Sequence, residues 1–486
     1  GPYFGSAVRL VHGSLPYRDF VLVQPPGITL LMSPAGLLSN LTGTAWGMAI
    51  GRLLTALAST AGVVLAGLLV RHRGLLAVMV ACGITAVYPN GVAAAHTVLV
   101  EPWLVLFCLA GAVAVFDGDK LATSTRRLAW GGAAFGFAGA VEAWAIVPVI
   151  VLLVLFAPQI RRAAVFAAGV AAGFVVPVLP FAAIAPRQFY QSLIVAQIGS
   201  RAHAHRVNLW VRLKNITGVV NLPLGHGGVL LAVLAIVAFA ALAYVIAWYR
   251  TGQPPARLDW FAAVTAALAV VMFLWPPQFH YHFSAFLAPF LALVIALPAA
   301  RLLAATQPAG ATRPAEGGQP ADGEQRGVSW QSRFAFGLAG LALAAMAVSQ
   351  FQADSVTPKV LGPVPAAVQR IVPAGACVLT DQASLTINAN RFVSSVPGCP
   401  QIVDSLGTDL ALSHGLKPGT GAARVAAVAA VWRSAFSHAQ YVLLTRINAR
   451  RIAWTPGIQA YFDANFVQVY TSPKHLMLYA RKGLRR

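Results

Sequence analysis

The sequence has few acidic residues, and it lacks the common nucleotide-binding motifs. Only 14 of its 486 residues are Asp or Glu, against 35 Lys and Arg, and charged residues make up 10% of the chain. Soluble domains carry about a quarter of charged residues, so this composition excludes a soluble enzyme of this size. No Walker loop, Gly-x-Gly-x-x-Gly fingerprint or Gly-x-Ser-x-Gly elbow occurs in a usable context. A reaction would therefore draw on a donor already in the membrane rather than on a cytosolic nucleotide.

The residues that are present are mostly apolar. Hydrophobic residues make up 58% of the chain, and the mean hydropathy is +0.70, which is typical of a protein that crosses a membrane many times. A net charge of +21 is also typical of nucleic-acid-binding proteins, but here the basic residues form short clusters between apolar runs. Loops that contact lipid headgroups explain these clusters better.

Nine apolar stretches predict ten membrane spans. Seven approach or exceed the roughly 20 residues that a straight helix needs to cross hydrocarbon, and they lie near 46–70, 98–116, 163–185, 226–249, 260–275, 284–305 and 334–350. Short segments rich in Lys and Arg connect several of these stretches, and the positive-inside rule predicts that these basic connections are cytoplasmic. Keeping all of them inside requires 75–88 to cross once and 128–157 to cross twice, with a turn near Glu142. Both ends of the chain then lie outside, which predicts an eleventh span ahead of Gly1 in the intact protein.

The fold class predicted is therefore an α-helical polytopic membrane protein with a C-terminal extracytoplasmic α/β domain. Residues 1–350 are expected to form the transmembrane domain, with 306–332 as a disordered cytoplasmic loop because it has almost no large apolar residue. Residues 351–486 are expected to form the soluble domain. Its predicted strands lie at 378–380, 441–445 and 467–470, and its predicted helix at 421–432.

Two of the four cysteines, Cys377 and Cys399, lie in this polar C-terminal region. If the region is outside the cytoplasm, we expect a disulfide between them, and two free thiols are the alternative. Cys82 and Cys108 lie in apolar spans and are expected to pack as small hydrophobic side chains.

Three acidic residues fall at the predicted outer ends of spans: Asp19, Glu101 and Glu142. An ionisable residue at membrane depth is a candidate for function because its desolvation is costly. Each also has a structural alternative. Asp19 could pair with Arg18 or cap a loop, Glu101 could favour the dipole at the start of its helix, and Glu142 could serve its turn alone.

A second set of polar and aromatic residues lies in the predicted outer loops. Arginine and histidine there suit a phosphate group through charge-assisted hydrogen bonds, and contact with lipid headgroups is the alternative. The candidates for substrate binding are Arg18, Gln24, His96, Glu142, Gln197, Arg201, His280, Tyr281 and His282. A metal site on His280 and His282 is disfavoured, because residues two apart on a helix do not face one way.

The order of three short motifs resembles the integral-membrane glycosyltransferases of the GT-C class, within the protein mannosyltransferase and aminoarabinose transferase-like superfamily. The motifs are Gly-x-x-Pro-Tyr-x-Asp-Phe followed by Gln-Pro-Pro at 13–26, an acid that opens a span at Glu101, and Phe-His-Tyr-His-Phe at 279–283. The resemblance covers roughly residues 3–305. The high Ala, Val, Gly and Arg content resembles that of actinobacterial membrane proteins.

The resemblance implies transfer of a sugar, such as arabinose or mannose, from a polyprenyl-phosphate donor to a glycan, lipid or protein acceptor of the cell envelope. It implies an inverting reaction at the outer face of the plasma membrane, with the active site and the C-terminal domain facing the periplasm. Asp19, or an acid upstream of this sequence, would act as base, and Glu101 would orient the acceptor or a divalent cation such as Mg or Mn. Arg18, Gln24, Arg201 and His282 would contact the phosphate and sugar of the donor.

Two other functions remain open from the sequence. A transporter or flippase for a lipid-linked or polar envelope substrate would show internal repeats and polar residues in mid-span, whereas here polar residues gather at the outer ends and Arg52 is the main exception. A non-catalytic scaffold would leave Asp19 and Glu101 replaceable without loss of activity.

Overall fold

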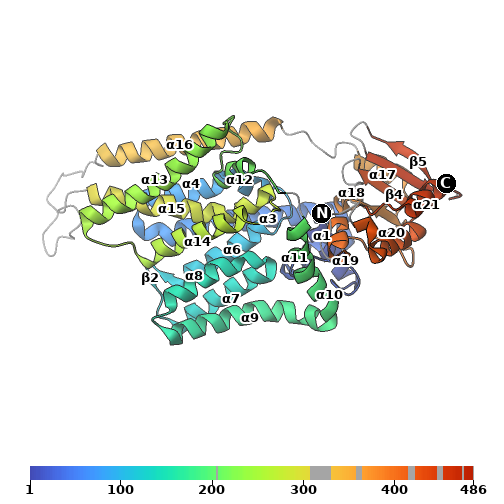
Figure 1. Ribbon diagram of the computed structural model, residues 1–486, viewed down its shortest axis with the longest axis horizontal. Helices are drawn as coiled ribbons and strands as arrows, with labels where there is room; N and C mark the ends of the chain where they lie inside the picture. The colour runs from blue at the N-terminus through green and yellow to red at the C-terminus, as the bar shows by residue number, and fades with distance from the viewer. Residues whose placement is uncertain are drawn as a thin grey trace.

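The computed structural model describes residues 1–203, 206–306, 330–356, 364–413, 422–445, 452–472 and 476–484. The molecule is elongated, with a bundle of long helices at one end and a domain of short helices and strands at the other (Figure 1). The N-terminus lies where the two parts meet. The predicted loop at 306–332 falls almost wholly outside the described residues.

Each of the ten predicted spans corresponds to a helix of the bundle. These helices are α3 (Thr44–Val70), α4 (Leu75–Val87), α6 (Glu101–Val115), α7 (Thr125–Val141), α8 (Ile146–Phe156), α9 (Ile160–Ile184), α13 (His226–Thr251), α14 (Arg257–Leu274), α15 (Ser284–Thr306) and α16 (Trp330–Val356). In the described part of the chain, six helices are long and apolar enough to cross a membrane, and α4 with α5 (Pro89–Ala95), bent by 60°, makes a seventh. The chain is therefore a multi-pass membrane protein, and the predicted fold class is confirmed.

Shorter elements connect and flank the long helices. They are α1 (Pro2–Val11), α2 (Gly27–Thr42), the turn η1 (Arg71–Arg73), the hairpin β1–β2 (Phe116–Asp117 and Lys120–Leu121), η2 (Ala143–Ala145), α10 (Pro186–Tyr190), a π-helical segment η3 (Gln191–Val195), α11 (Ala196–His203), α12 (Leu209–Ile216) and η4 (Tyr281–Phe283). Helix α2 was not predicted as a separate element. It is set off from α3 by Gly43, whose φ of +87° ends the helix.

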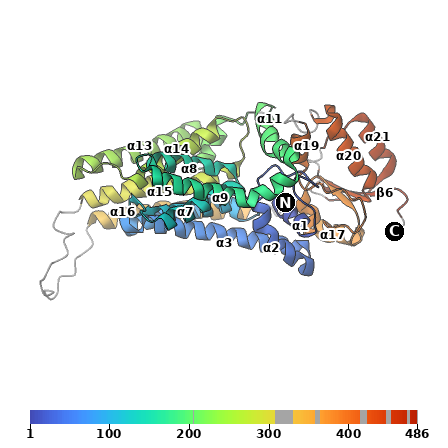
Figure 2. The same cartoon turned by 90° about the horizontal axis from the view of Figure 1, so that it is seen from below.

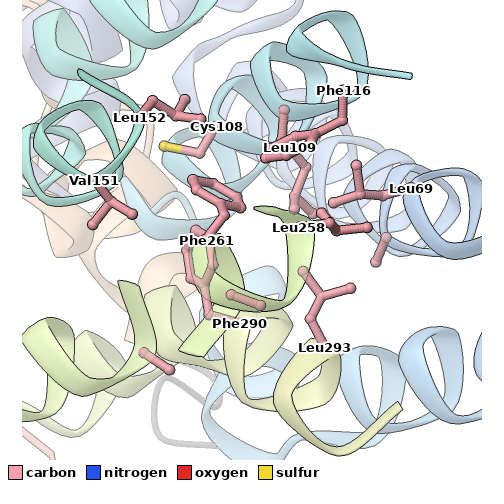
Figure 3. Close-up of a cluster of buried hydrophobic side chains, with 14 of the residues drawn as sticks. Leu69, Cys108, Leu109, Phe116, Val151, Leu152, Leu258, Phe261, Phe290 and Leu293 are labelled. Atoms are coloured by element: carbon pink, nitrogen blue, oxygen red, sulfur yellow. The ribbon is translucent and has the colours of Figure 1, made fainter. Parts of the chain in front are cut away.

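The core of the bundle is built from large apolar side chains of α3, α6, α8, α14 and α15. Figure 3 shows Cys108 and Leu109 of α6 facing Phe261 of α14, with Phe290 of α15 beneath. The rings of Phe261 and Phe290 are 6.0 Å apart. Cys108 is 1% exposed, so it packs as a small hydrophobic residue, as predicted.

Helices α7 and α9 approach each other closely because glycines line their contact. A Cβ on Gly132 or Gly136 of α7 would overlap the carbonyl oxygen of Phe166 or Val170 on α9. Gly169 and Gly173 face α7 in the same way, against Ala129 and Ala133. Two glycines spaced four apart on each helix form a small-xxx-small interface, which lets membrane helices pack backbone against backbone.

Helix α16 packs loosely on the bundle by comparison. A cavity of about 470 Å³ separates it from α4, α13 and α15, and side chains such as Val80, Phe239 and Leu338 line it. Because its lining is almost wholly apolar, the cavity suits hydrocarbon chains rather than a polar ligand.

The C-terminal part is an α/β domain around a four-stranded sheet of order β3-β4-β6-β5. Its elements are α17 (Val364–Ile371), β3 (Val378–Thr380), α18 (Ala383–Asn388), α19 (Ser405–Leu412), η5 (Ala422–Arg424), α20 (Ala426–His438), β4 (Tyr441–Thr445), α21 (Pro456–Asn465), β5 (Phe466–Thr471) and β6 (Leu476–Arg481). Strands β3 and β4 are parallel, and the other pairs are antiparallel. The three predicted strands are present, β6 was not predicted, and the predicted helix begins later, at Ala426. Cys377 and Cys399 form a disulfide.

The C-terminal domain docks onto the first helices of the chain through specific polar contacts. The Thr44 hydroxyl donates to the carbonyl of Ile387 at 2.7 Å, and the Asn390 side chain accepts from the backbone of Ala45 at 2.8 Å. The Arg9 guanidinium lies 4.5 Å from the centre of the Phe392 ring. In Figure 2, α19 of this domain lies beside α11, and Ala196 of α11 packs in one cluster with residues of α19.

Candidate functional site

The centre of the candidate site is a close contact between the side chains of Glu101 and His282. Glu101 begins α6 and is fully buried, and its Oε1 lies 2.6 Å from Nδ1 of His282 in η4. The other carboxylate oxygen, Oε2, is also buried and has no hydrogen-bond partner among the described residues. A buried carboxylate oxygen without a partner is costly, so this atom is available for a group brought by a substrate.

A buried polar network holds the turn that carries His282. Asn90 of α5 donates to the hydroxyl of Ser284 at 2.7 Å and to Oδ1 of Asn215 at 2.9 Å. Ser284 in turn donates to the carbonyl of Tyr281. The Tyr88 hydroxyl donates to the carbonyl of Ile216 at 2.9 Å. These bonds join α5, α12 and the start of α15, and they fix the position of the His282 turn.

Arg212 of α12 organises the chain just before this turn. It is 1% exposed, and its guanidinium donates to the carbonyls of Phe273 at 2.7 Å and of Pro277. The guanidinium also lies 5.6 Å from the centre of the Phe279 ring. Carbonyls at the end of a helix need such donors, so Arg212 caps α14 and shapes the loop that leads to His280.

The Glu142 turn lies next to the His282 turn. Trp144, two residues after Glu142, packs edge-on against Phe283 with a ring separation of 4.5 Å and against Phe273 at 5.2 Å. Glu142 itself ends α7 and is 8% exposed. Gly27 packs against the same helix end, since a Cβ there would lie 2.5 Å from the carbonyl oxygen of Ala140.

Tyr3 of α1 is the point at which several acidic groups converge. Burial raises the pKa of the Tyr3 phenol well above its ordinary value, and three carboxylates raise it further, those of Glu101, Glu142 and Asp404. A hydrogen bond with the Gln24 side chain acts in the opposite direction. The site is therefore bounded by α1, the 13–27 loop, the start of α6, the end of α7 and the start of α19.

Asp19 lies in an exposed turn of the 13–27 loop. Its carboxylate accepts from Arg18 at 2.8 and 2.9 Å and from the backbone of Leu15 at 2.7 Å. The hydrogen bond from Arg18 is the main reason why the pKa of Asp19 is lowered. Tyr17, with φ of +68°, closes the turn, and its hydroxyl donates to the carbonyl of Gln24 at 2.6 Å. The contacts shown for Asp19 stay within residues 15–19, which is the arrangement of a loop cap.

Of the other predicted site residues, some contact His282 and others lie elsewhere in the structure. Gln197 of α11 donates to the carbonyl of Val23 at 3.0 Å and so ties α11 to the 13–27 loop. His280 is exposed and stacks on His282 with ring centres 5.6 Å apart, and Tyr281 packs edge-on to His282. His96 directly follows α5 and is exposed. Arg201 belongs to α11, but its side chain lies outside the described part of the structure.

Three residues near the site were not predicted as part of it: Tyr3, Arg52 and Asp404. Asp404 acts electrostatically on the Tyr3 phenol, and Arg52 follows Gly51 of α3, which packs against Phe4 and Val98. The Nε of Arg52 is buried with no hydrogen-bond partner among the described residues. Arg52 could have been singled out from the sequence, because it is a charged residue inside an apolar run. Asp404 could not, since it precedes a short helix in a domain without recognisable motifs.

The described residues contain no group of three or more His, Cys, Asp or Glu side chains that could hold a metal ion. The pair of Glu101 and His282 supplies two such side chains, of which one is a carboxylate.

Comparison with solved structures shows what this fold is similar to. ArnT from Cupriavidus metallidurans bound to undecaprenyl phosphate matches with a TM-score of 0.58 and 14% identity, over 100% of this chain and 94% of that one. The Archaeoglobus fulgidus oligosaccharyltransferase tethered to an acceptor peptide matches with a TM-score of 0.53 and 14% identity, over 99% of this chain and 69% of that one. No protein-family model and no curated protein sequence matches the chain. The shared fold is that of GT-C glycosyltransferases, as the sequence predicts.

Proposed function

We propose that this protein is a membrane glycosyltransferase that moves a sugar from a polyprenyl-phosphate donor to an acceptor of the cell envelope. The observation that carries the proposal is the buried carboxylate of Glu101, with Oε1 held by His282 and Oε2 without a partner among the described residues, in a fold shared with ArnT and the Archaeoglobus fulgidus oligosaccharyltransferase. One of those solved structures holds undecaprenyl phosphate and another a dolichol phosphate with an inhibitory peptide. Which sugar and acceptor this chain uses is a matter for the experiment below.

The reaction needs a base for the acceptor hydroxyl. In this proposal Oε2 of Glu101 accepts the proton as the hydroxyl oxygen attacks the anomeric carbon, and His282 keeps the carboxylate in position through Oε1. The geometry favours Glu101 over Asp19 for this role, because the Asp19 carboxylate is already engaged by Arg18 and Leu15. A lowered pKa also makes Asp19 a weak base.

The reaction also needs positive charge where the lipid phosphate leaves. Arg52 is suited to this, since its Nε is buried without a partner among the described residues and donors of this kind bind phosphate strongly. Because lipid phosphate is a good leaving group, it needs no second acid to protonate it. A single displacement of this kind inverts the anomeric centre.

The orientation follows from the charges of the loops. The basic connections, such as Arg71–Arg73 and Arg161–Arg162, lie at the end of the bundle remote from the C-terminal domain. The positive-inside rule puts that end in the cytoplasm. In this proposal the Glu101 site and the C-terminal domain, residues 351–486, face the periplasm, and the transmembrane domain comprises residues 1–350.

The test is transfer of labelled sugar by the purified full chain from a panel of polyprenyl-phosphate sugars to envelope extract. Glu101→Gln keeps the shape of the side chain and removes the base, so the rate should fall at least about a hundredfold. Asp463→Asn serves as the matched control, because Asp463 is an exposed acid of α21 in the C-terminal domain, and its side chain accepts a hydrogen bond from Gln459. Full activity in Glu101→Gln, with folding retained, would contradict the assignment of the base. No transfer from any donor by the unmodified chain would contradict the function itself.

A further inference from the structure

A second polar cavity lies at the opposite end of the bundle from the Glu101 site. It has a volume of about 500 Å³ and is lined by residues that end α3 and α6, begin α7 and form the β1–β2 hairpin. Figure 1 shows β2 at the end remote from the C-terminal domain. Its ionisable lining residues are Arg71, His72, Asp117 and Arg127, and the others are Leu68, Leu69, Val113, Phe116 and Gly118.

Arg127 is held rigidly at one wall of this cavity. Its guanidinium donates to the carbonyls of Phe116 at 2.6 Å, Ala114 at 3.0 Å and Val113 at 3.2 Å, and so caps the end of α6. Its side chain is nevertheless 41% exposed. Its remaining nitrogen, Nη1, lies 3.5 Å from Oδ1 of Asp117. A ligand would share this nitrogen with Asp117, and the fixed guanidinium would lose little further side-chain freedom on binding.

Arg71 supplies the cation that has no partner of its own. It is exposed, and its guanidinium makes no hydrogen bond or ion pair with any described residue. Its neighbour His72 is occupied, because Nε2 lies 2.8 Å from Oδ1 of Asp119. Asp119 is in turn paired with Arg73 at 2.7 Å.

One acidic side chain also faces the cavity and must be counted. Asp117 lies 3.5 Å from Arg127, and its side chain is 77% exposed. Apart from His72, which is engaged by Asp119, the lining carries two arginines and one carboxylate, which leaves a surplus of one positive charge. That surplus matches the single negative charge of a phosphodiester.

The apolar part of the lining indicates how the phosphodiester would be attached. Leu68 is 42% exposed on the last turn of α3, and Leu69, Val113 and Phe116 continue the apolar wall into the cavity. Inorganic phosphate has no apolar part that could pack against these side chains, whereas a phospholipid has a glycerol backbone and acyl chains. Basic pockets between the ends of membrane helices are known sites for anionic lipid headgroups.

We propose that this cavity binds the headgroup of an anionic phospholipid, with its phosphodiester between Arg71 and Arg127 and its acyl chains along Leu68. The site lies apart from Glu101 and its ligand is not consumed. Its lipid would tie the ends of α3, α6 and α7 to the leaflet on that side of the membrane.

Native mass spectrometry of the purified full chain tests the proposal, with phosphatidylglycerol and phosphatidylcholine of the same acyl chains as probes. One favourable cation at a membrane surface is worth about fivefold in binding. We expect phosphatidylglycerol to be retained about fivefold better than phosphatidylcholine, Arg71→Gln to abolish that preference, and Arg71→Lys to keep most of it. Arg161→Gln is the control, because Arg161 is an exposed arginine at the same end that does not line the cavity.

Three results would overturn the proposal. Equal retention of the two lipids by the unmodified chain would show no recognition of negative charge. An equal loss of preference in Arg71→Gln and Arg161→Gln would assign it to the general surface charge. Displacement of phosphatidylglycerol by millimolar inorganic phosphate would assign the cavity to the free anion.

Discussion

Glu101 and His282 lie 181 residues apart in the sequence, and a contact of 2.6 Å joins them in the structure. The pair is buried, with Glu101 fully covered and the His282 side chain 17% exposed. Removing one partner from a buried pair leaves the other without compensation, which usually costs more than removing both. The two residues should therefore be energetically coupled.

This coupling predicts an unusual order of stabilities. His282→Ala should lower the free energy of unfolding by about 3–5 kcal/mol, because it leaves the Glu101 carboxylate buried and unpaired. The double variant Glu101→Gln/His282→Ala should be more stable than His282→Ala alone. Thermal unfolding in detergent, followed by intrinsic fluorescence, measures both. Additive losses in the double variant would show that the two side chains do not interact.

A second prediction concerns Asp19. Its folded-state pKa lies below the ordinary 3.8, chiefly because of the Arg18 hydrogen bond. A lowered pKa means that the stabilisation is fully present above the unfolded-state pKa and is lost as the pH falls through the folded-state value. Any destabilisation by Asp19→Asn should therefore vanish in strong acid. Because the contacts of Asp19 are those of a loop cap, Asp19→Asn and Arg18→Gln should each change the transfer rate at pH 7 less than about tenfold.

Comparison of Asp19→Asn and Arg18→Gln with Glu101→Gln distinguishes a structural role of Asp19 in its loop from a role as catalytic base. If Asp19→Asn alone abolished transfer while Arg18→Gln did not, Asp19 would carry the chemistry. In the unmodified protein, the transfer rate measured from pH 5 to 8 should show no change caused by titration of Asp19, because the pKa of Asp19 lies below that range.

The contact between α7 and α9 gives a third prediction. Gly136→Ala places a methyl group on the carbonyl oxygen of Val170 and should destabilise the protein by about 1–3 kcal/mol. Gly139→Ala is the matched control, because a Cβ there would meet only the Phe174 ring at an ordinary 3.4 Å. Thermal unfolding of the two variants should differ clearly. Equal stability would mean that the helices are further apart than the structure shows.

The disulfide of the C-terminal domain gives a fourth. Cys377 and Cys399 are separated by 22 residues, and closing a loop of this size stabilises a domain by about 3 kcal/mol. Cys377→Ala/Cys399→Ala should unfold at a lower temperature than the unmodified protein. A reducing agent should lower the unfolding temperature of the unmodified protein towards that of the variant and leave the variant unchanged. An effect of the same size on both would point to another target of the reducing agent.

The sequence predicts the membrane part of the fold well, because helices that cross lipid must be apolar and the loops between them on the cytoplasmic side are basic. The turn at Glu142 lies between α7 and α8 as the parity of the spans requires. Helix α2 was missed, because Pro34 interrupts its apolar run and the mostly polar segment from Ser39 to Thr42 follows before Gly43 ends the helix. Strand β6 was missed even though Leu476, Leu478 and Ala480 alternate along it, because the three predicted strands already accounted for a small sheet.

The site was harder to predict than the fold. Glu101, Glu142 and His282 could be singled out because charge or imidazole at the end of a span is expensive. Their mutual contacts could not, because pairing across such sequence separations depends on how the helices pack. Asp404 and Tyr3 approach each other only because the C-terminal domain docks on α1 and α3, and no local pattern records that docking.

The glycine contact between α7 and α9 also determines where the site can open. Since backbone meets backbone at Gly132, Gly136, Gly169 and Gly173, neither helix can slide or tilt against the other without a steric clash. The two helices therefore behave as a single rigid strut. Helix α11, which contacts the 13–27 loop through Gln197, is joined to that strut through Ala185 and the π-helical segment Gln191–Val195. Any change in the position of α11 relative to these two helices therefore falls on the connecting residues rather than on α7 or α9.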